Sequence, residues 1–311
     1  MNITYFDALS RGWDRMKKAL FQPFDLGKWF VVGFTAFLAA LLDGPGGGGG
    51  GKRWDHSPNF DEFAEFPALA KDWLGSHPAW AGLILFGILF LIVLIVVFAW
   101  LSSRGKFLFL HNVVHDKAEV TKPWHEYRRQ GDSLFLWRLV YGVIVFAAFI
   151  LMFFFFFGLI VKMIHHDITG AQKVYTIFGM VLLFLTLFII TSYISLFLND
   201  FVVPVMFKYK ISATKGWGKF LPLMSRHFGY FLLYGIIIFL LIIFIIFCVV
   251  LFGLVTCCIG FLLLIIPYIG SIVLLPISYT MRSFSVEFLA QFGPDFDVFP
   301  SADTTGEIET A

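Results

Sequence analysis

The sequence has few charged residues and few cysteines, and each shortage excludes some classes of protein. Charged residues make up 14% of its 311 residues, whereas soluble domains carry about 25%. Hydrophobic residues reach 59%, and the mean hydropathy is +0.84. This balance excludes a pair of soluble domains and predicts an integral membrane protein. The three cysteines, which lie in or beside apolar segments, exclude a disulfide framework.

Motifs that would indicate catalysis or nucleotide binding are also missing from the sequence. The glycine run at 46–51 lacks the Lys-Ser/Thr pair that grips phosphate, and there is neither a nucleophile elbow nor a CxxC pair. The first 28 residues have no early apolar stretch and no small-residue cleavage site, so we expect no secretory signal peptide. The sequence therefore predicts a non-enzymatic protein without a cofactor and without a nucleic-acid partner.

Long apolar runs predict an all-α fold with six membrane spans, because about 20 apolar residues cross the hydrocarbon core as a helix. The first run is short and becomes a marginal span only when extended back through Phe24 and Leu26. We expect residues 1–293 to form one domain of three helical hairpins, each preceded by a cytoplasmic interfacial helix. The predicted spans are 29–42, 80–101, 135–161, 174–198, 229–255 and 258–280.

The distribution of Lys and Arg between the predicted loops indicates the orientation in the membrane. The segments on one side hold 17 Lys and Arg residues and those on the other side hold 5. We therefore predict a multi-pass protein of the cell (inner) membrane with cytoplasmic N- and C-termini.

Two segments of the sequence are predicted to lie outside the bundle. The Gly-rich loop at 43–79 faces the outside, and its glycine run serves either as a flexible tether or as a mobile lid. Within it, residues 60–74 have the pattern of a short helix on the outer membrane surface. The tail 294–311 carries acids and no base, which predicts a disordered cytoplasmic end.

A short polar pattern recurs three times before predicted spans. Residues 10–13, 121–124 and 214–217 all read Ser/Thr, Lys/Arg, Gly/Pro, Trp, and nine of the 26 positions from 121 to 146 are identical at an offset of 93. Ser and Thr favour helix N-caps, and Trp favours the headgroup level of a membrane. The pattern predicts either an internal repeat or elbow helices favoured by membrane insertion. Its predicted interfacial anchors are Trp13, Trp124 and Trp217.

The stretch from Ser195 to Phe239 resembles a known kind of membrane domain. An apolar stretch with Pro204, a short polar loop and an interfacial helix with Trp217 precede the next span. This layout resembles the six-span bacterial and archaeal domains typified by the membrane domain of glycerophosphodiester phosphodiesterases and related uncharacterised families. Those domains often carry an acid soon after the proline, where this chain has Lys208-Tyr209-Lys210. The catalytic barrel has no room here, so the resemblance implies a membrane module without phosphodiesterase activity.

Two groups of polar residues are candidates for a functional site. His111 and His115 are four residues apart and precede Asp116, so they either bind a divalent metal or form a polar cytoplasmic extension of the second span. A polar stripe near the end of the fourth span either forms a membrane-embedded site or lies at the cytoplasmic interface. The residues of this stripe are Ser192, Ser195, Asn199 and Asp200.

These features support two hypotheses about function. The first is an accessory or scaffold protein that acts through contacts with membrane lipids and other membrane proteins, because the predicted spans contain almost no charge. The second is a transporter or channel for an apolar or lipid-like substrate, because Pro267 and Pro276 interrupt the last span. Those prolines also fit helix kinks that serve only packing. In support of the first hypothesis, Arg138 is the only charged residue within the predicted spans.

Overall fold

The structure, a computed structural model, describes residues 3–42, 73, 75–165, 170–256 and 259–299. Within these ranges every regular element is a helix. The predicted all-α fold is therefore confirmed. The glycine run and most of the loop 43–79, including most of the predicted helix at 60–74, lie outside the described residues, as do residues 300–311 of the tail.

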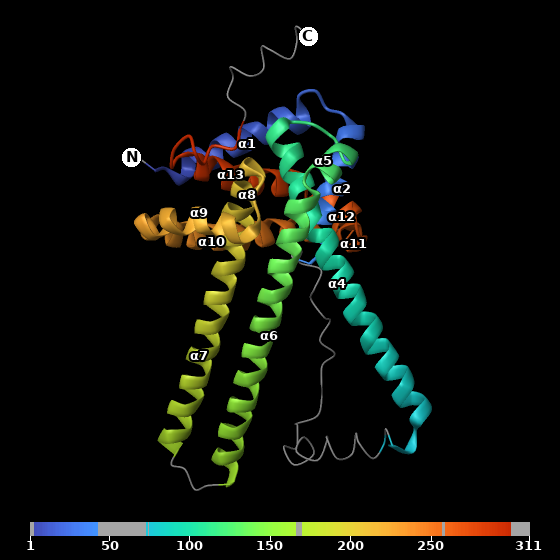
Figure 1. The fold of residues 1–311 in the computed structure, drawn as a ribbon, viewed down its shortest axis with the longest axis vertical. Helices are drawn as coiled ribbons and strands as arrows, with labels where there is room; N and C mark the ends of the chain where they lie inside the picture. The colour runs from blue at the N-terminus through green and yellow to red at the C-terminus, as the bar shows by residue number, and fades with distance from the viewer. Residues whose placement is uncertain (1–2, 43–72, 74, 166–169, 257–258, 300–311) are drawn as a thin grey trace.

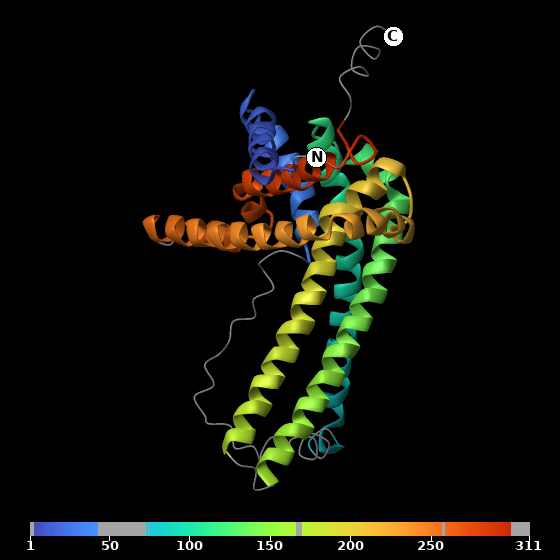
Figure 2. The same ribbon diagram turned by 90° about the vertical axis from the view of Figure 1, so that its left-hand side faces the viewer.

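Three long helices extend away from one end of the molecule, and the first of them diverges from the other two (Figures 1 and 2). They are α4 (Pro78–His115), α6 (Arg128–His165) and α7 (Gly170–Phe197). A fourth long helix, α10 (Phe228–Val255), runs across them rather than along them, as Figure 2 shows. Most large apolar side chains on these shafts are exposed on the protein surface, which is the arrangement expected where lipid replaces water as the solvent.

The structure contains four helices that are long and apolar enough to cross a membrane, counted over the described residues, and six spans are not seen. The predicted first span corresponds to α2 (Leu26–Ala40), a helix of only 15 residues. It begins after Pro23, and Asp25 caps it, because the Asp25 carboxylate accepts the Gly27 N–H at 2.8 Å. The predicted arrangement of three spanning hairpins is therefore not what the structure has. Of the predicted pairs, α6 and α7 form an antiparallel hairpin (Figure 1).

The predicted sixth span, 258–280, is not a single helix. Pro267 lies between α11 and α12, and Pro276 lies in the first turn of α13. Proline has no N–H for a helix interior but fits a first turn, so each proline separates two helices instead of kinking one. The segment consists of α11 (Ile259–Ile265), α12 (Ile269–Val273) and α13 (Leu275–Ala290).

The short helices gather around one end of the long helices and bury the core there (Figure 1). At this compact end the last turns of α4, from Ser102 to Val114, are buried. Aromatic side chains in mutual contact fill the centre, among them Phe201, Tyr234 and Phe288. The short helices are α1 (Tyr5–Phe21), α2, α5 (Thr121–Glu126), α8 (Val203–Tyr209), α9 (Ala213–Arg226) and α13.

The three copies of the recurring pattern each lie in a helix, but the predicted Ser/Thr caps are wrong. Ser10 lies inside α1, and neither α5 nor α9 has a side-chain cap. The break before the next long helix falls at Tyr127 in the second copy, which aligns with Phe220, yet at His227 in the third. The two later copies therefore differ in helix length, and α6 and α10 point in different directions (Figure 2).

The beginning of the predicted disordered tail is ordered in the structure. The Tyr209 hydroxyl donates to the Asp295 carbonyl at 2.9 Å, and Lys208 donates to the Pro294 carbonyl. The guanidinium of Arg15 lies 3.6 Å above the Phe299 ring. Residues 294–299 thus pack against the compact end, because their aromatic and carbonyl groups find partners there.

Candidate functional site

A partly buried polar cluster lies where α7 continues into α8. The connection is a π-helical turn, η2 (Leu198–Val202), which carries the predicted residues Asn199 and Asp200. Such turns are rare in helices and are frequent at functional sites. We call the side chains that meet here the polar cluster; they are Lys106, Asn199, Asp200, Tyr234 and Arg282.

The π-helical turn has a local cause in the sequence. The Val203 N–H donates to the carbonyl of Leu198, five residues earlier, instead of to Asn199 as in an α-helix. The next residue, Pro204, has no N–H to donate. The Asn199 carbonyl is thereby left without a helical donor, and the Arg282 guanidinium donates to it at 2.7 Å. The turn thus fastens α13 to the end of α7.

The side chains of the turn are bound from two further helices. Lys106 of α4, which is buried, donates to the side-chain carbonyl of Asn199. The fully buried Tyr234 of α10 donates its hydroxyl to the Asp200 carboxylate at 2.9 Å. The positive charges of Lys106 and Arg282 also act on Asp200. A buried carboxylate needs such compensation, so the cluster ties four segments of the chain together.

The two serines of the predicted stripe do not join the polar cluster. Ser192 is exposed on α7, and Ser195 is partly buried near Tyr141, whose hydroxyl donates to the Thr191 carbonyl at 3.0 Å. The π-helical turn changes the register of the helix after residue 197, so spacing rules for an α-helix do not carry across it. Sequence reasoning also missed Lys106, Tyr234 and Arg282, although the two cations are isolated charges next to apolar runs.

The predicted histidine group is only partly assembled. The rings of His111 and His115 lie 4.4 Å apart between centroids, but Asp116 turns outward and pairs with Lys28 at 2.9 Å. Glu119 lies over His111 instead, with an Oε2–Nε2 distance of 3.8 Å. Over the part of the chain that the structure describes, no group of three His, Cys, Asp or Glu side chains is placed to hold a metal ion. The absence of a metal stays a prediction.

A second charged group joins α4 to α6 and contains one of the predicted tryptophan anchors. Arg104 donates to both carboxylate oxygens of Asp132, at 2.8 and 3.0 Å, and lies over the rings of Trp100 and Trp124. The Trp100 indole N–H donates to the same carboxylate at 3.0 Å. Trp124 therefore packs against an ion pair whose arginine is buried and whose aspartate is partly exposed, which is a contact within the protein in addition to any with lipid.

The other two predicted anchors have different surroundings. Trp217 is stacked on Trp137 with ring centroids 5.6 Å apart, and its side chain is partly buried. Trp13 is 49% exposed and lies on α1. The role of all three as membrane anchors stays a prediction.

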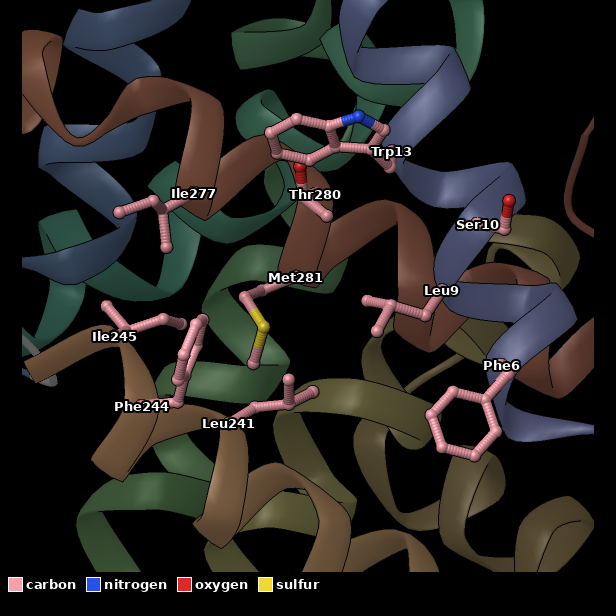
Figure 3. A pocket seen from close by; sticks show the side chains of 10 residues that line it. All are labelled: Phe6, Leu9, Ser10, Trp13, Leu241, Phe244, Ile245, Ile277, Thr280 and Met281. Carbon is pink, nitrogen blue, oxygen red and sulfur yellow. The ribbon is translucent and has the colours of Figure 1, made fainter. Parts of the chain in front are cut away.

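Trp13 borders an open apolar groove between α1, α10 and α13 (Figure 3). The groove has a volume of about 400 Å³. Helix α10 contributes Leu241, Phe244 and Ile245, and Met281 of α13 lies above them in Figure 3. The remaining lining residues are Phe6, Leu9, Ser10, Ile277 and Thr280.

Over the residues that the structure describes, the protein is all-α and has four helices long and apolar enough to cross a membrane, which indicates a multi-pass membrane protein. Residues 3–290 match the model of a family of unknown function, DUF7544, and the chain belongs to this family. The comparisons with curated proteins and with solved structures gave no match. The resemblance to the membrane domain of glycerophosphodiester phosphodiesterases stays a prediction.

Proposed function

We propose that this protein is a non-enzymatic integral membrane protein of the cell membrane that acts as an accessory or scaffold through contacts with lipids and other membrane proteins. The observation that carries this proposal is the separation of charge along the long axis. The charged side chains of α4 and of the first turns of α6 lie at the compact end, while the shafts of α4, α6 and α7 expose apolar side chains.

The charged residues of the compact end support a structural rather than a catalytic role. Asp132 is held by Arg104, and Glu287 of α13 pairs with Arg11 and Arg15 of α1. Asp200 is bound by Tyr234 and faces two cations. A catalytic acid or base needs access to a substrate proton, and these carboxylates are already occupied by partners from neighbouring helices.

The orientation is part of the same proposal. The basic helices α1 and α9 lie at the compact end (Figure 1), and Lys and Arg favour the cytoplasmic side. We therefore place the compact end and both ends of the chain on the cytoplasmic side. The basic side chains then face anionic headgroups, to which each contributes roughly 1 kcal/mol of attraction.

A second candidate function is transport of an apolar or lipid-like substrate. It is favoured by the interrupted segment α11–α13 and by the π-helical turn, because broken helices build substrate sites in transporters. The polar cluster would then be the region that rearranges between the conformational states of the transport cycle.

Reconstitution into liposomes separates the two candidates. The purified protein is reconstituted with a fluorescent phosphatidylcholine, and dithionite is added to bleach the outer leaflet. Native mass spectrometry of the same preparation reports bound lipid. The scaffold proposal predicts bound lipid and a bleached fraction equal to that of protein-free liposomes. Bleaching beyond that level in wild type, lost in Asp200→Asn, would support transport and overturn the scaffold proposal.

A further inference from the structure

We propose that the groove between α1, α10 and α13 binds one acyl chain of an anionic phospholipid, whose phosphate lies at a rim formed by Ser10, Trp13 and Lys17. This inference rests on the proposed membrane function and names the ligand of one site within it. The argument has three parts, which concern the apolar floor, the polar rim and the route of entry.

The floor of the groove suits a hydrocarbon chain. Its volume of about 400 Å³ falls within the range of roughly 300–1,000 Å³ that is usual for small-molecule sites. The Thr280 hydroxyl, one of the few polar groups in the lining, already donates to the Pro276 carbonyl at 2.7 Å. The flexible Met281 lies over the centre of the floor and can adjust to a chain of irregular shape (Figure 3).

The rim of the groove carries hydrogen-bond donors on one face of α1. Phe6, Ser10, Trp13 and Lys17 are three or four residues apart, so they share a face of the helix. Figure 3 shows the Trp13 indole nitrogen and the Ser10 hydroxyl on the side away from Leu241. An indole N–H and a hydroxyl are donors that a phosphate oxygen accepts.

Lys17 adds the positive charge that an anionic lipid requires. It pairs with Asp14 at 2.9 Å, but both side chains are about half exposed, and such surface pairs are weak. Arg11 and Arg15 lie on a different face of α1 and bind Glu287 of α13. The basic charge at the groove therefore comes from Lys17, one turn beyond Trp13.

The groove opens beside the exposed apolar surface of α10, which suits contact with lipid. Helix α10 is apolar on all sides, and its side chains Leu240, Phe247 and Leu251 are exposed next to those that form the floor. A chain from the surrounding lipid therefore reaches the groove over apolar surface, without crossing a polar barrier. The combination of this surface with a basic rim favours a phospholipid over a second apolar helix.

Photochemical labelling in nanodiscs tests the inference. The probe is a phosphatidylglycerol with a diazirine at the end of one acyl chain, diluted into phosphatidylcholine, and labelled peptides are mapped by mass spectrometry. Wild type should be labelled on the groove peptides of α1, α10 and α13. Leu241→Trp fills the groove and should reduce this labelling to background. The matched variant Leu240→Trp, at an exposed position outside the groove lining, should leave it unchanged.

A second pair of variants tests the headgroup. Lys17→Gln should lower groove labelling by phosphatidylglycerol about fivefold, because one lysine near an anionic lipid contributes roughly that factor. Lys18, the next residue, lies about 100° around the α1 axis from Lys17 and off the face that holds Ser10 and Trp13, so Lys18→Gln should have no effect. If Leu241→Trp fails to fold, as judged by gel filtration and thermal melting, the lysine pair carries the test.

Several outcomes would overturn the inference. It would be overturned if Leu240→Trp and Leu241→Trp showed equal groove labelling, or if the two lysine variants lost labelling equally. Cross-linking of the groove to a second copy of the chain would also overturn it. Labelling of the α6 and α7 shafts by the same probe reports membrane embedding separately. Labelled shafts with an unlabelled groove refute the inference alone, whereas unlabelled shafts refute the proposed function as well.

Discussion

Replacing Arg282 with methionine should destabilise the compact end, because this guanidinium binds a backbone carbonyl that the π-helical turn leaves without a helical donor. Arg282 donates to the Asn199 carbonyl at 2.7 Å and supplies positive charge to Asp200. Methionine keeps much of the aliphatic volume but removes the donor and the charge. The carbonyl is then unpaired, and Asp200 keeps only Lys106 and Tyr234.

The expected loss follows from two contributions. A hydrogen bond from a charged donor contributes about 1.5–3 kcal/mol, and breaking one partner from a buried charged group costs about 3–5 kcal/mol. Since Asp200 retains two partners, we expect the lower end, about 3 kcal/mol. At roughly 2–4 °C per kcal/mol for a chain of this order of size, the melting temperature should fall by about 6–12 °C.

Thermal melting in detergent, followed by tryptophan fluorescence, measures this effect against a matched control. The control is Arg128→Met, because the Arg128 side chain is 72% exposed and its ion pair with Asp132 spans 4.0 Å. Exposed pairs contribute less than about 1 kcal/mol, so its melting temperature should change by only about 2 °C. In a Pro204→Ala background, the restored N–H competes for the free carbonyl, and Arg282→Met should be less harmful. Equal losses in Arg282→Met and Arg128→Met, or the same Arg282→Met loss in both backgrounds, would refute the reasoning.

Two further predictions concern helix packing and pH. Gly105→Ala should lower the melting temperature strongly, because a Cβ there would lie 2.6 Å from the backbone of Leu38 on α2. The control Gly142→Ala has open space around the new Cβ and should melt at the same temperature as wild type. The hydrogen bond from Lys210 lowers the pKa of Glu126, so its stabilisation is complete above the ordinary glutamate pKa and is lost as the pH falls through the lowered value. Lys210→Gln should therefore reduce the melting temperature slightly at pH 7 and not at the acid end of the titration; an equal reduction at both would argue against this pair.

The sequence predicted the helical class and the long apolar helices well, because a run of 20 or more apolar residues has few alternatives. It overestimated the number of spans where prolines fall inside an apolar run. Around Pro267 and Pro276, hydropathy averaged over a window is continuous, while the missing N–H groups divide the backbone. Averaging hydropathy over a window therefore detects an apolar run but not the break between helices at each proline.

Only part of the candidate site was predicted from the sequence. Asn199 and Asp200 were found because they are polar residues at the end of an apolar run. Their partners Lys106, Tyr234 and Arg282 lie 34 to 93 residues away in sequence and were not found. Such contacts depend on how the helices pack, and no local pattern encodes them. The π-helical turn could have been suspected from Pro204, which withholds a donor one turn after Asp200.

The central claim is that the shafts of the long helices lie in lipid with the compact end on the cytoplasmic side, and single-cysteine labelling in intact cells tests it most directly. In a background without the three native cysteines, a water-soluble maleimide is applied to variants at Lys173, Leu185 and Thr214. Leu185 is 48% exposed on the protein surface, so only lipid would protect it. We predict no labelling at Leu185, labelling at Lys173 from outside, and labelling at Thr214 only after permeabilisation. Labelling at Leu185, or labelling of Lys173 and Thr214 from the same side, would contradict the claim.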